Sequence, residues 1–166
     1  MWGGSLLDYD QPIYLIARQA DLDEAVRILH KIGMDKIAGY FDAVEVEAAN
    51  LRSESIEQLT VNELQQKLAA GEVELVDVRG QSERLESRIE QASAHFLGKF
   101  FDEVNELDKQ QPVAVHCRSG GRSIVAASIA KRAGIERVLN VVGGIQAWEL
   151  AGLPTITDQS QTVTQL

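Results

Sequence analysis

The sequence predicts an α/β fold in which an open parallel sheet carries helices on both faces. Short, nearly continuous apolar segments alternate with helical segments along most of the chain, and glycines stand where several helices should end. Strands that are separated by helices pair in parallel, and strands buried on both faces read as continuous apolar runs. The composition, 45% hydrophobic and 25% charged, is that of a chain that can bury a core.

The best-defined elements follow residue 56. Thr60 and Glu63 have the spacing of a capping box, which opens a helix that ends at Gly71. Apolar strands are predicted at residues 74–78, 112–116 and 138–142, and further helices at 100–107 and 123–133. The apolar face expected for the helix at 100–107 consists of Phe100, Phe101, Val104 and Leu107.

The start of the chain repeats part of this pattern. Residues 12–18 align with residues 112–118 at an offset of 100, and Gly33 aligns with Gly134 at an offset of 101. Ala17 takes the place of Cys117 in the first copy. We therefore predict a duplication. The predicted parts are a partial, degenerate repeat at 1–44, a linker at 45–55, a complete domain at 56–154 and a polar, poorly ordered tail at 155–166.

Composition excludes several function classes. The 16 Lys and Arg against 25 Asp and Glu give a net charge of −9, which disfavours nucleic acid as a partner. No apolar run approaches the ~20 residues that span a bilayer. The one cysteine, Cys117, can form neither an internal disulfide nor a cysteine-rich zinc site, so we expect no metal or other cofactor and a reducing, cytoplasmic location.

The segment from Cys117 to Ser123 lies between a predicted strand end and a predicted helix start. Its residues are Cys117, Arg118, Ser119, Gly120, Gly121, Arg122 and Ser123. Ligands of open parallel sheets bind at this edge, adjacent glycines let backbone N–H groups turn inward, and the helix start favours an anion. The same features lower the pKa of a thiol and make it nucleophilic. The alternative interpretation, a buried cysteine that only fills space, leaves the arginines and glycines unexplained.

These residues carry a resemblance to the rhodanese domain, a sulfurtransferase fold, over about 100 of the 166 residues from Glu57 to Pro154. The matching residues are Leu75-Val76-Asp77-Val78-Arg79, Glu83, Ile89, Ala92, Val115 through Ser123, Gly143-Gly144, Trp148 and Gly152-Leu153-Pro154. The resemblance implies that Cys117 takes sulfur from thiosulfate or a small persulfide and passes it to a thiol or cyanide. It makes residues 118–123 the binding loop and Asp77 and Arg79 supporting residues.

Other activities remain as alternatives. The phosphatases and arsenate reductases of this superfamily have five residues between Cys and Arg, whereas four lie between Cys117 and Arg122, which suits a single sulfur atom better. A non-catalytic or redox-sensing interaction module is the second alternative. The stretch Ser87–Ala92 departs from the family pattern, which leaves the donor and the acceptor open.

The first 44 residues resemble the inactive rhodanese repeat of fusion proteins in which a metallo-β-lactamase-fold domain, often a persulfide dioxygenase, precedes two such repeats. The resemblance implies an upstream domain of that kind as a partner. We also expect the apolar strand and helix at residues 13–41 to be covered, either by the complete domain or by a second copy in a homodimer.

Overall fold

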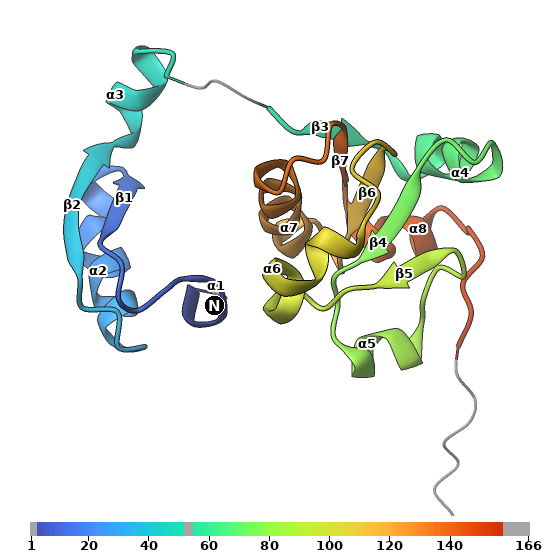
Figure 1. Cartoon of the computed structure of the whole chain (residues 1–166), viewed down its shortest axis with the longest axis horizontal. Coiled ribbons are helices and arrows are strands. Elements are labelled where there is room, and N and C mark those ends of the chain that lie inside the picture. Colours follow the sequence, from blue (N-terminus) through green and yellow to red (C-terminus); the bar gives the residue numbers. More distant parts are fainter. Residues whose placement is uncertain (1–2, 52–54, 158–166) are drawn as a thin grey trace, which may run out of the picture. The chain divides into compact units, whose positions relative to one another are not determined.

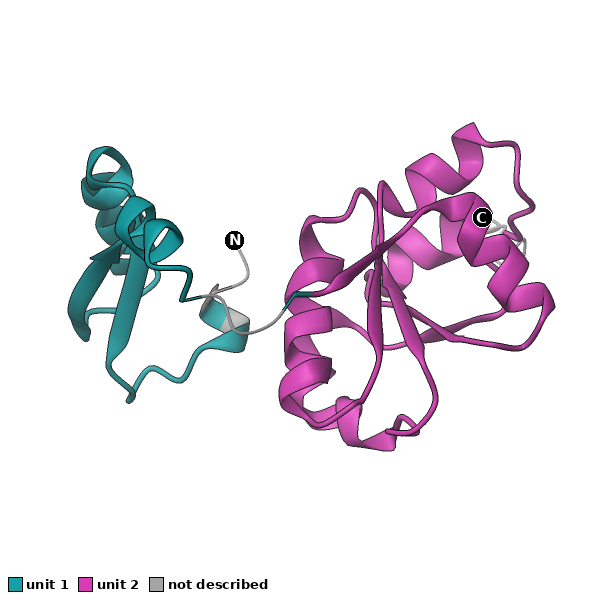
Figure 2. Cartoon of the chain, turned by 90° about the horizontal axis from the view of Figure 1, so that it is seen from above, with its two compact units in different colours: residues 1–55 teal, residues 56–166 magenta. Residues whose placement is uncertain are grey.

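The structure, a computed structural model, describes residues 3–51 and 55–157. It divides the chain into two compact units, residues 1–55 and residues 56–166 (Figure 2). We call them unit 1 and unit 2. The predicted boundary between the linker and the complete domain falls at the same place in the sequence.

Unit 2 is built on a five-stranded sheet in which every strand pair is parallel (Figure 1). The spatial order is β3-β7-β6-β4-β5. The strands are β3 (Glu57–Leu59), β4 (Glu74–Asp77), β5 (Ala92–Ala94), β6 (Val113–His116) and β7 (Val138–Val141). Because all strands run the same way, their carboxyl ends meet at one edge of the sheet, where ligands bind in folds of this class.

Helices cover both faces of this sheet, which confirms the predicted fold class. Helices α4 and α8 lie over one face, and α6 and α7 lie over the other (Figure 1). The helical elements are α4 (Val61–Ala69), α5 (Gln81–Glu86), α6 (Phe100–Glu103), α7 (Gly121–Arg132), α8 (Gly144–Leu150) and the 3₁₀ turns η2 (Leu97–Lys99) and η3 (Val104–Glu106). The capping box of α4 is present as predicted, with Thr60 and Glu63 bonded to each other's backbone N–H groups.

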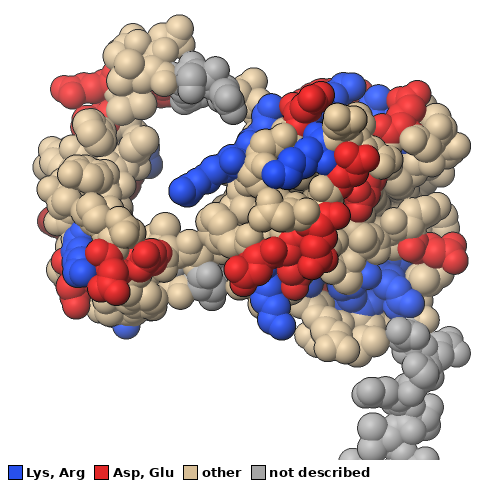
Figure 3. Space-filling model, viewed as in Figure 1, with Lys and Arg blue, Asp and Glu red and all other residues tan. Residues whose placement is uncertain are grey.

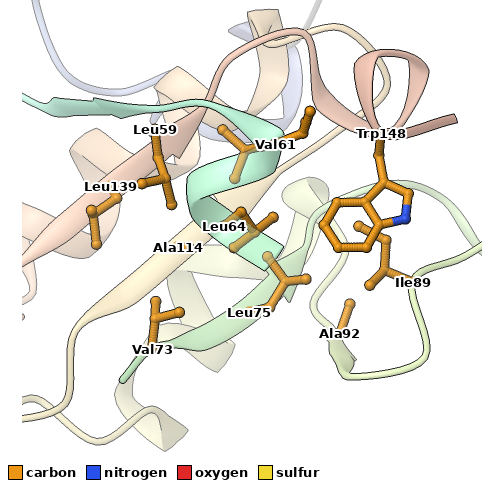
Figure 4. Close-up of a cluster of buried hydrophobic side chains, with 11 residues drawn as sticks. Leu59, Val61, Leu64, Val73, Leu75, Ile89, Ala92, Ala114, Leu139 and Trp148 are labelled. Atoms are coloured by element: carbon orange, nitrogen blue, oxygen red, sulfur yellow. The ribbon is translucent and has the colours of Figure 1, made fainter. Parts of the chain in front are cut away.

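A buried apolar cluster joins α4 and α8 to the sheet (Figure 4). Leu64 from α4 and Trp148 from α8 meet Leu75, Ala114 and other strand residues of one pleat face. The indole N–H of Trp148 donates to the carbonyl of Pro154 at 2.9 Å, so its one polar atom is satisfied. Trp148 is therefore a core residue with its indole N–H bonded.

The predicted helix at 100–107 is shorter than expected. Helix α6 ends at Glu103 and passes into the 3₁₀ turn η3. Phe100 and Val104 are buried, but Phe101 is 41% exposed, so the expected apolar face is wrong for this residue. Consecutive helical residues point about 100° apart, and with Phe100 directed into the core Phe101 lies at the solvent edge of this short helix.

Unit 1 has a two-stranded parallel sheet, β1 with β2, that α2 connects. The same strand–helix–strand order, also parallel, is found in β6–α7–β7. Gly33 and Gly134 both have a positive φ after the helix. The elements are α1 (Gly3–Leu6), β1 (Ile13–Ala17), the 3₁₀ turn η1 (Gln19–Asp21), α2 (Leu22–His30), β2 (Ile37–Asp42) and α3 (Ala43–Ala48). The duplication itself stays a prediction.

Two segments expected to lack structure are partly ordered. Residues 45–48, assigned to the linker, belong to α3, whose first turn is capped by Asp42 accepting from the Val44 N–H at 2.8 Å. In the tail, Ile156 forms an antiparallel bridge with Arg88, with both N–H···O distances at 2.9 Å. Residues 158–166 of the tail lie outside the described residues.

One face of the unit 1 sheet is apolar and exposed. Tyr14 and Ile16 of β1 are 61% and 66% exposed, and Phe41 of β2 is 56% exposed. The Tyr14 and Phe41 rings lie 6.3 Å apart. A homodimer through residues 1–44 stays a prediction.

Candidate active site

Cys117 lies at the carboxyl edge of the sheet, directly after β6 and four residues before α7 begins. The side chain is only 1% exposed. Gly120 has a φ of 110°, a conformation that favours glycine, and its N–H points at the Cys117 Sγ atom over 3.1 Å. The loop therefore curls around the sulfur, as the paired glycines predict.

The surroundings of the thiol favour its ionised form. Burial opposes ionisation, but the Ser123 hydroxyl and the backbone N–H groups of Ser123, Gly120 and Ser119 together hold the pKa of Cys117 below its ordinary value. Ser123 is fully buried, and its hydroxyl also lies 3.0 Å from the Gly120 carbonyl. A hydroxyl carries a single proton that rotates between acceptors, so the Gly120 carbonyl and the Cys117 sulfur compete for it. These donors therefore favour the thiolate over the thiol at Cys117.

Arg122 closes the loop but does not present a free charge. Its two guanidinium nitrogens donate to the two carboxylate oxygens of Glu83, in α5, at 2.6 and 2.7 Å. This hydrogen-bonded pair holds the pKa of Glu83 below its ordinary value. Glu83 is therefore a paired, half-buried residue at the loop. The positive field expected at the loop is partly cancelled by this carboxylate.

Helix α8 holds the other side of the loop. The N–H groups of Ile145 and Gln146 donate to the carbonyls of Cys117 and Arg118 at 2.9 and 3.1 Å. Gly144 makes this approach feasible, since a Cβ atom there would lie 2.3 Å from the Cys117 carbonyl oxygen. The Gly143-Gly144 pair thus packs against the Cys117 loop in addition to making the turn after β7.

Asp77 and Arg79 form a buried ion pair below the loop. Arg79 donates to both Asp77 oxygens, at 2.7 Å for the shortest contact, and to the Ser87 carbonyl at the end of α5, also at 2.7 Å. Arg84 also lies 3.0 Å from Asp77. These contacts tie α5, which carries Glu83, to the end of β4, and give the two predicted supporting residues a structural position.

His116 borders the same cluster. Its Nδ1 lies 3.2 Å from the Cys117 carbonyl and its Nε2 lies 3.6 Å from Asp77. Burial, together with the neighbouring arginine charges, holds the pKa of His116 below its ordinary value, so the imidazole is neutral at neutral pH. The side chain is fully buried, hence it is not a base that a substrate can reach.

A small pocket of 140 Å³ opens beside the loop, between α5 and α8. We call it the α5–α8 pocket. Arg118 from the loop, Glu83 and Glu86 from α5, and Gln146 and Glu149 from α8 are among its lining residues. The structure thus gathers all the predicted site residues near one edge of the sheet. The hydrophobic periodicity of the sequence does not indicate that Glu83, Glu86 and Glu149 lie at this pocket, because their position there depends on how α5 and α8 pack.

The described residues contain neither a helix long and apolar enough to cross a membrane nor a group of three or more side chains that could hold a metal ion. Figure 3 shows basic and acidic side chains interspersed over the visible face of unit 2. This face carries no continuous basic patch of the kind that nucleic-acid binding requires.

Comparisons with known proteins agree with this geometry. The sulfurtransferase of Allochromatium vinosum is 34% identical over 105 residues, which are 63% of this chain and 98% of that protein. The putative sulfurtransferase YtwF of Bacillus subtilis is 35% identical over 95 residues, 57% of this chain and 91% of that protein. The solution structure of a rhodanese-like domain from an Anabaena protein superposes with a TM-score of 0.58 at 25% identity, over 68% of this chain and 88% of that one.

The family model that describes the rhodanese-like domain matches residues 60–151, which include β4, the Cys117 loop and all of α8 up to Leu150. A fusion to a metallo-β-lactamase-fold domain stays a prediction. On the match and the relatives together, the chain belongs to the rhodanese-like domain family.

Proposed function

We propose that this protein is a sulfurtransferase that works through a persulfide on Cys117. The observation that carries the proposal is the short loop closed around the sulfur, with the Gly120 N–H aimed at Sγ over 3.1 Å. The lowered pKa of Cys117 supplies the thiolate that attacks a sulfane sulfur. The names of the relatives, sulfurtransferase among them, support the same reaction class.

The donor in this proposal is thiosulfate or a small persulfide, and the acceptor is a thiol or cyanide. The N–H groups of residues 118–122 bind the sulfur or the leaving oxyanion, and the exposed Arg118 attracts the anion. No cofactor takes part in this reaction. The proposed location is the cytoplasm, where a single unpaired cysteine stays reduced.

Mass spectrometry of the intact protein after treatment with thiosulfate or an organic persulfide tests this proposal. We expect one sulfur atom to be added to Cys117 and to be lost again on addition of cyanide or a thiol. A Cys117→Ser variant should neither take up sulfur nor turn over. Wild-type protein that gains no sulfur, or a Cys117→Ser variant that turns over as fast, contradicts the proposal.

A redox-sensing module is the second candidate, and the buried, ionisable Cys117 is the observation that keeps it in view. This function requires Cys117 to react with hydrogen peroxide while sulfur donors leave it unchanged. The same mass spectra separate the two functions.

A further inference from the structure

The α5–α8 pocket presents charges of both signs beside the Cys117 loop. Arg118, which follows Cys117 in the chain, is exposed and lines the pocket. Glu86 at the end of α5 and Glu149 in α8 are exposed as well, and line the same pocket. The volume of 140 Å³ is small for a ligand site, so its occupant is a small molecule.

The other charges around this pocket are already paired. Glu83 is paired with Arg122, and Arg79 is paired with Asp77. Among the residues that the structure describes, Arg118 and Glu86 make no ion pair, and Glu149 accepts only the Ser87 hydroxyl, at 2.6 Å. One cation and two carboxylates of the pocket therefore remain available to a ligand.

This charge arrangement discriminates between ligands. A small dianion such as thiosulfate is attracted by Arg118 and repelled by Glu86 and Glu149. A molecule that carries both a carboxylate and an ammonium group finds a partner for each, because opposite charges at hydrogen-bond distance attract and like charges add a cost. Electrostatic complementarity of this kind sets specificity more than overall affinity.

We propose that the α5–α8 pocket selects a thiol-bearing α-amino acid, cysteine in its simplest form, as the sulfur acceptor of Cys117. The proposal deepens the proposed function and rests on it. Arg118 binds the carboxylate, and Glu149 with Glu86 binds the ammonium group. A ligand held in this way lies against the Cys117 loop, because Arg118 and Ile145, whose N–H donates to the Cys117 carbonyl, both line the pocket.

The transfer step conserves atoms and electrons. The acceptor thiolate attacks the outer sulfur of the Cys117 persulfide, a sulfur–sulfur bond forms on the acceptor, and the bond from the outer sulfur to Sγ breaks. Its electron pair stays on Cys117 as the thiolate, which the Gly120 N–H and the other loop donors stabilise. The products are the acceptor persulfide and the free enzyme, and no outside oxidant or reductant takes part.

The test compares acceptors that differ by one charged group. Protein loaded on Cys117 with sulfur from thiosulfate or an organic persulfide is mixed with cysteine, with 3-mercaptopropionate, which lacks the ammonium group, or with cysteamine, which lacks the carboxylate. The rate of sulfur loss from Cys117 gives kcat/KM for each thiol. Intrinsic thiol reactivity cancels when the same two thiols are compared in wild type and variant.

We expect the cysteine to 3-mercaptopropionate ratio to fall about fivefold in Glu149→Gln and further in the double variant with Glu86→Gln, as loss of one partly exposed charge pair predicts. Arg118→Gln should lower the cysteine to cysteamine ratio instead. Glu106→Gln is the matched control: it removes one exposed negative charge in η3, outside the pocket, and should leave both ratios unchanged.

The two proposals fail in different ways. The pocket assignment alone is overturned if all three thiols remove sulfur from Cys117 and neither carboxylate variant changes the ratio of kcat/KM for cysteine to that for 3-mercaptopropionate. Absence of sulfur uptake by Cys117 overturns the proposed function, and the pocket assignment with it.

Discussion

Glu83 determines how much positive charge Cys117 experiences. The carboxylate binds both guanidinium nitrogens of Arg122, the residue that closes the loop. The pKa of Arg122 is raised mainly by its hydrogen bonds to Glu83 and, to a smaller extent, by the charge of the nearby Cys117 thiolate. Because this interaction is mutual, the Arg122 charge also favours the thiolate. A loop that is strongly cationic in sequence is therefore closer to neutral in the fold.

Replacing Glu83 with Gln should lower the pKa of Cys117 further, because it removes a negative charge beside Arg122. Alkylation of Cys117 by iodoacetamide should then extend to lower pH, while the free energy of unfolding falls by about 1–2 kcal/mol with loss of a charged hydrogen-bond pair. The pH profile of alkylation and urea unfolding measure the two effects. Glu106→Gln serves as the control, and a profile unchanged from wild type contradicts the prediction.

The buried cluster below the loop makes the fold sensitive to acid. His116 is neutral in the native state, with a pKa below its ordinary value, because burial disfavours the imidazolium. In the unfolded chain the same residue binds a proton below a pH of about 6.5. Stability that depends on His116 is thus lost as the pH falls from there, since only the unfolded state gains the proton.

We expect the free energy of unfolding in urea to decline as the pH falls from about 7 to about 5. The carboxylates of Asp77 and Glu83 also have pKa values below their ordinary ones. Their contribution to the free energy of unfolding is lost only at lower pH, as the pH falls from the unfolded pKa of each group through its folded pKa. A His116→Gln variant should be flat over the upper part of this range. If the free energy of unfolding falls equally steeply with pH in the variant and in wild type, His116 is not the group responsible.

At the scale of elements, the turn from β7 into α8 acts as a support for the Cys117 loop. The first N–H groups of α8 bond to the loop carbonyls, and Gly144 leaves no room for a side chain. The chemistry on β6–α7 therefore depends on a turn that lies more than twenty residues further along the chain.

Substitution of Gly144 by Ala should displace the loop and reduce sulfur uptake by Cys117 by more than tenfold. Gly71→Ala is the matched control, because Gly71 also has a positive φ, 67° against 56°, but a Cβ atom there meets nothing within 4 Å. The control should cost about 1–2 kcal/mol of stability from backbone strain alone and leave uptake intact. Equal uptake by the two variants would argue against a supporting role for the turn.

At the scale of the whole molecule, the candidate active site and the large apolar core belong to unit 2. Unit 1 buries only Met34 fully among its described residues. The cluster that joins α4, α8 and the sheet contains no residue of unit 1.

A chain that begins at Ile56 should fold by itself and take up sulfur on Cys117 at a rate within about twofold of the full chain, because it keeps the complete core and loop. Urea unfolding, which should remain cooperative, and mass spectrometry after donor treatment check this. A truncated chain that fails to unfold cooperatively, or that takes up no sulfur, shows that unit 1 is required.

Local signals in the sequence were sufficient for the central strands, the α4 capping box and the Cys117 loop. Thr60 and Glu63 are three residues apart, and the loop residues are contiguous, so their geometry follows from near neighbours. Glu83 and Arg122 are 39 residues apart, and their pairing arises from the packing of α5 against the loop. Neither periodicity nor propensity contains that information. The short elements β3 and β5, three residues each, are below the length that a period can reveal.

The position of β3 has a consequence for how unit 2 forms. This edge strand comes first in the sequence of the unit, yet it pairs with β7, and its first residue, Glu57, binds Arg137 from 80 residues away. Closing so long a loop costs entropy before any contact is made, which slows folding. During synthesis β3 can pair only after β7, which ends at Val141, has left the ribosome. The strand that is synthesised first in this unit is therefore among the last to join the sheet.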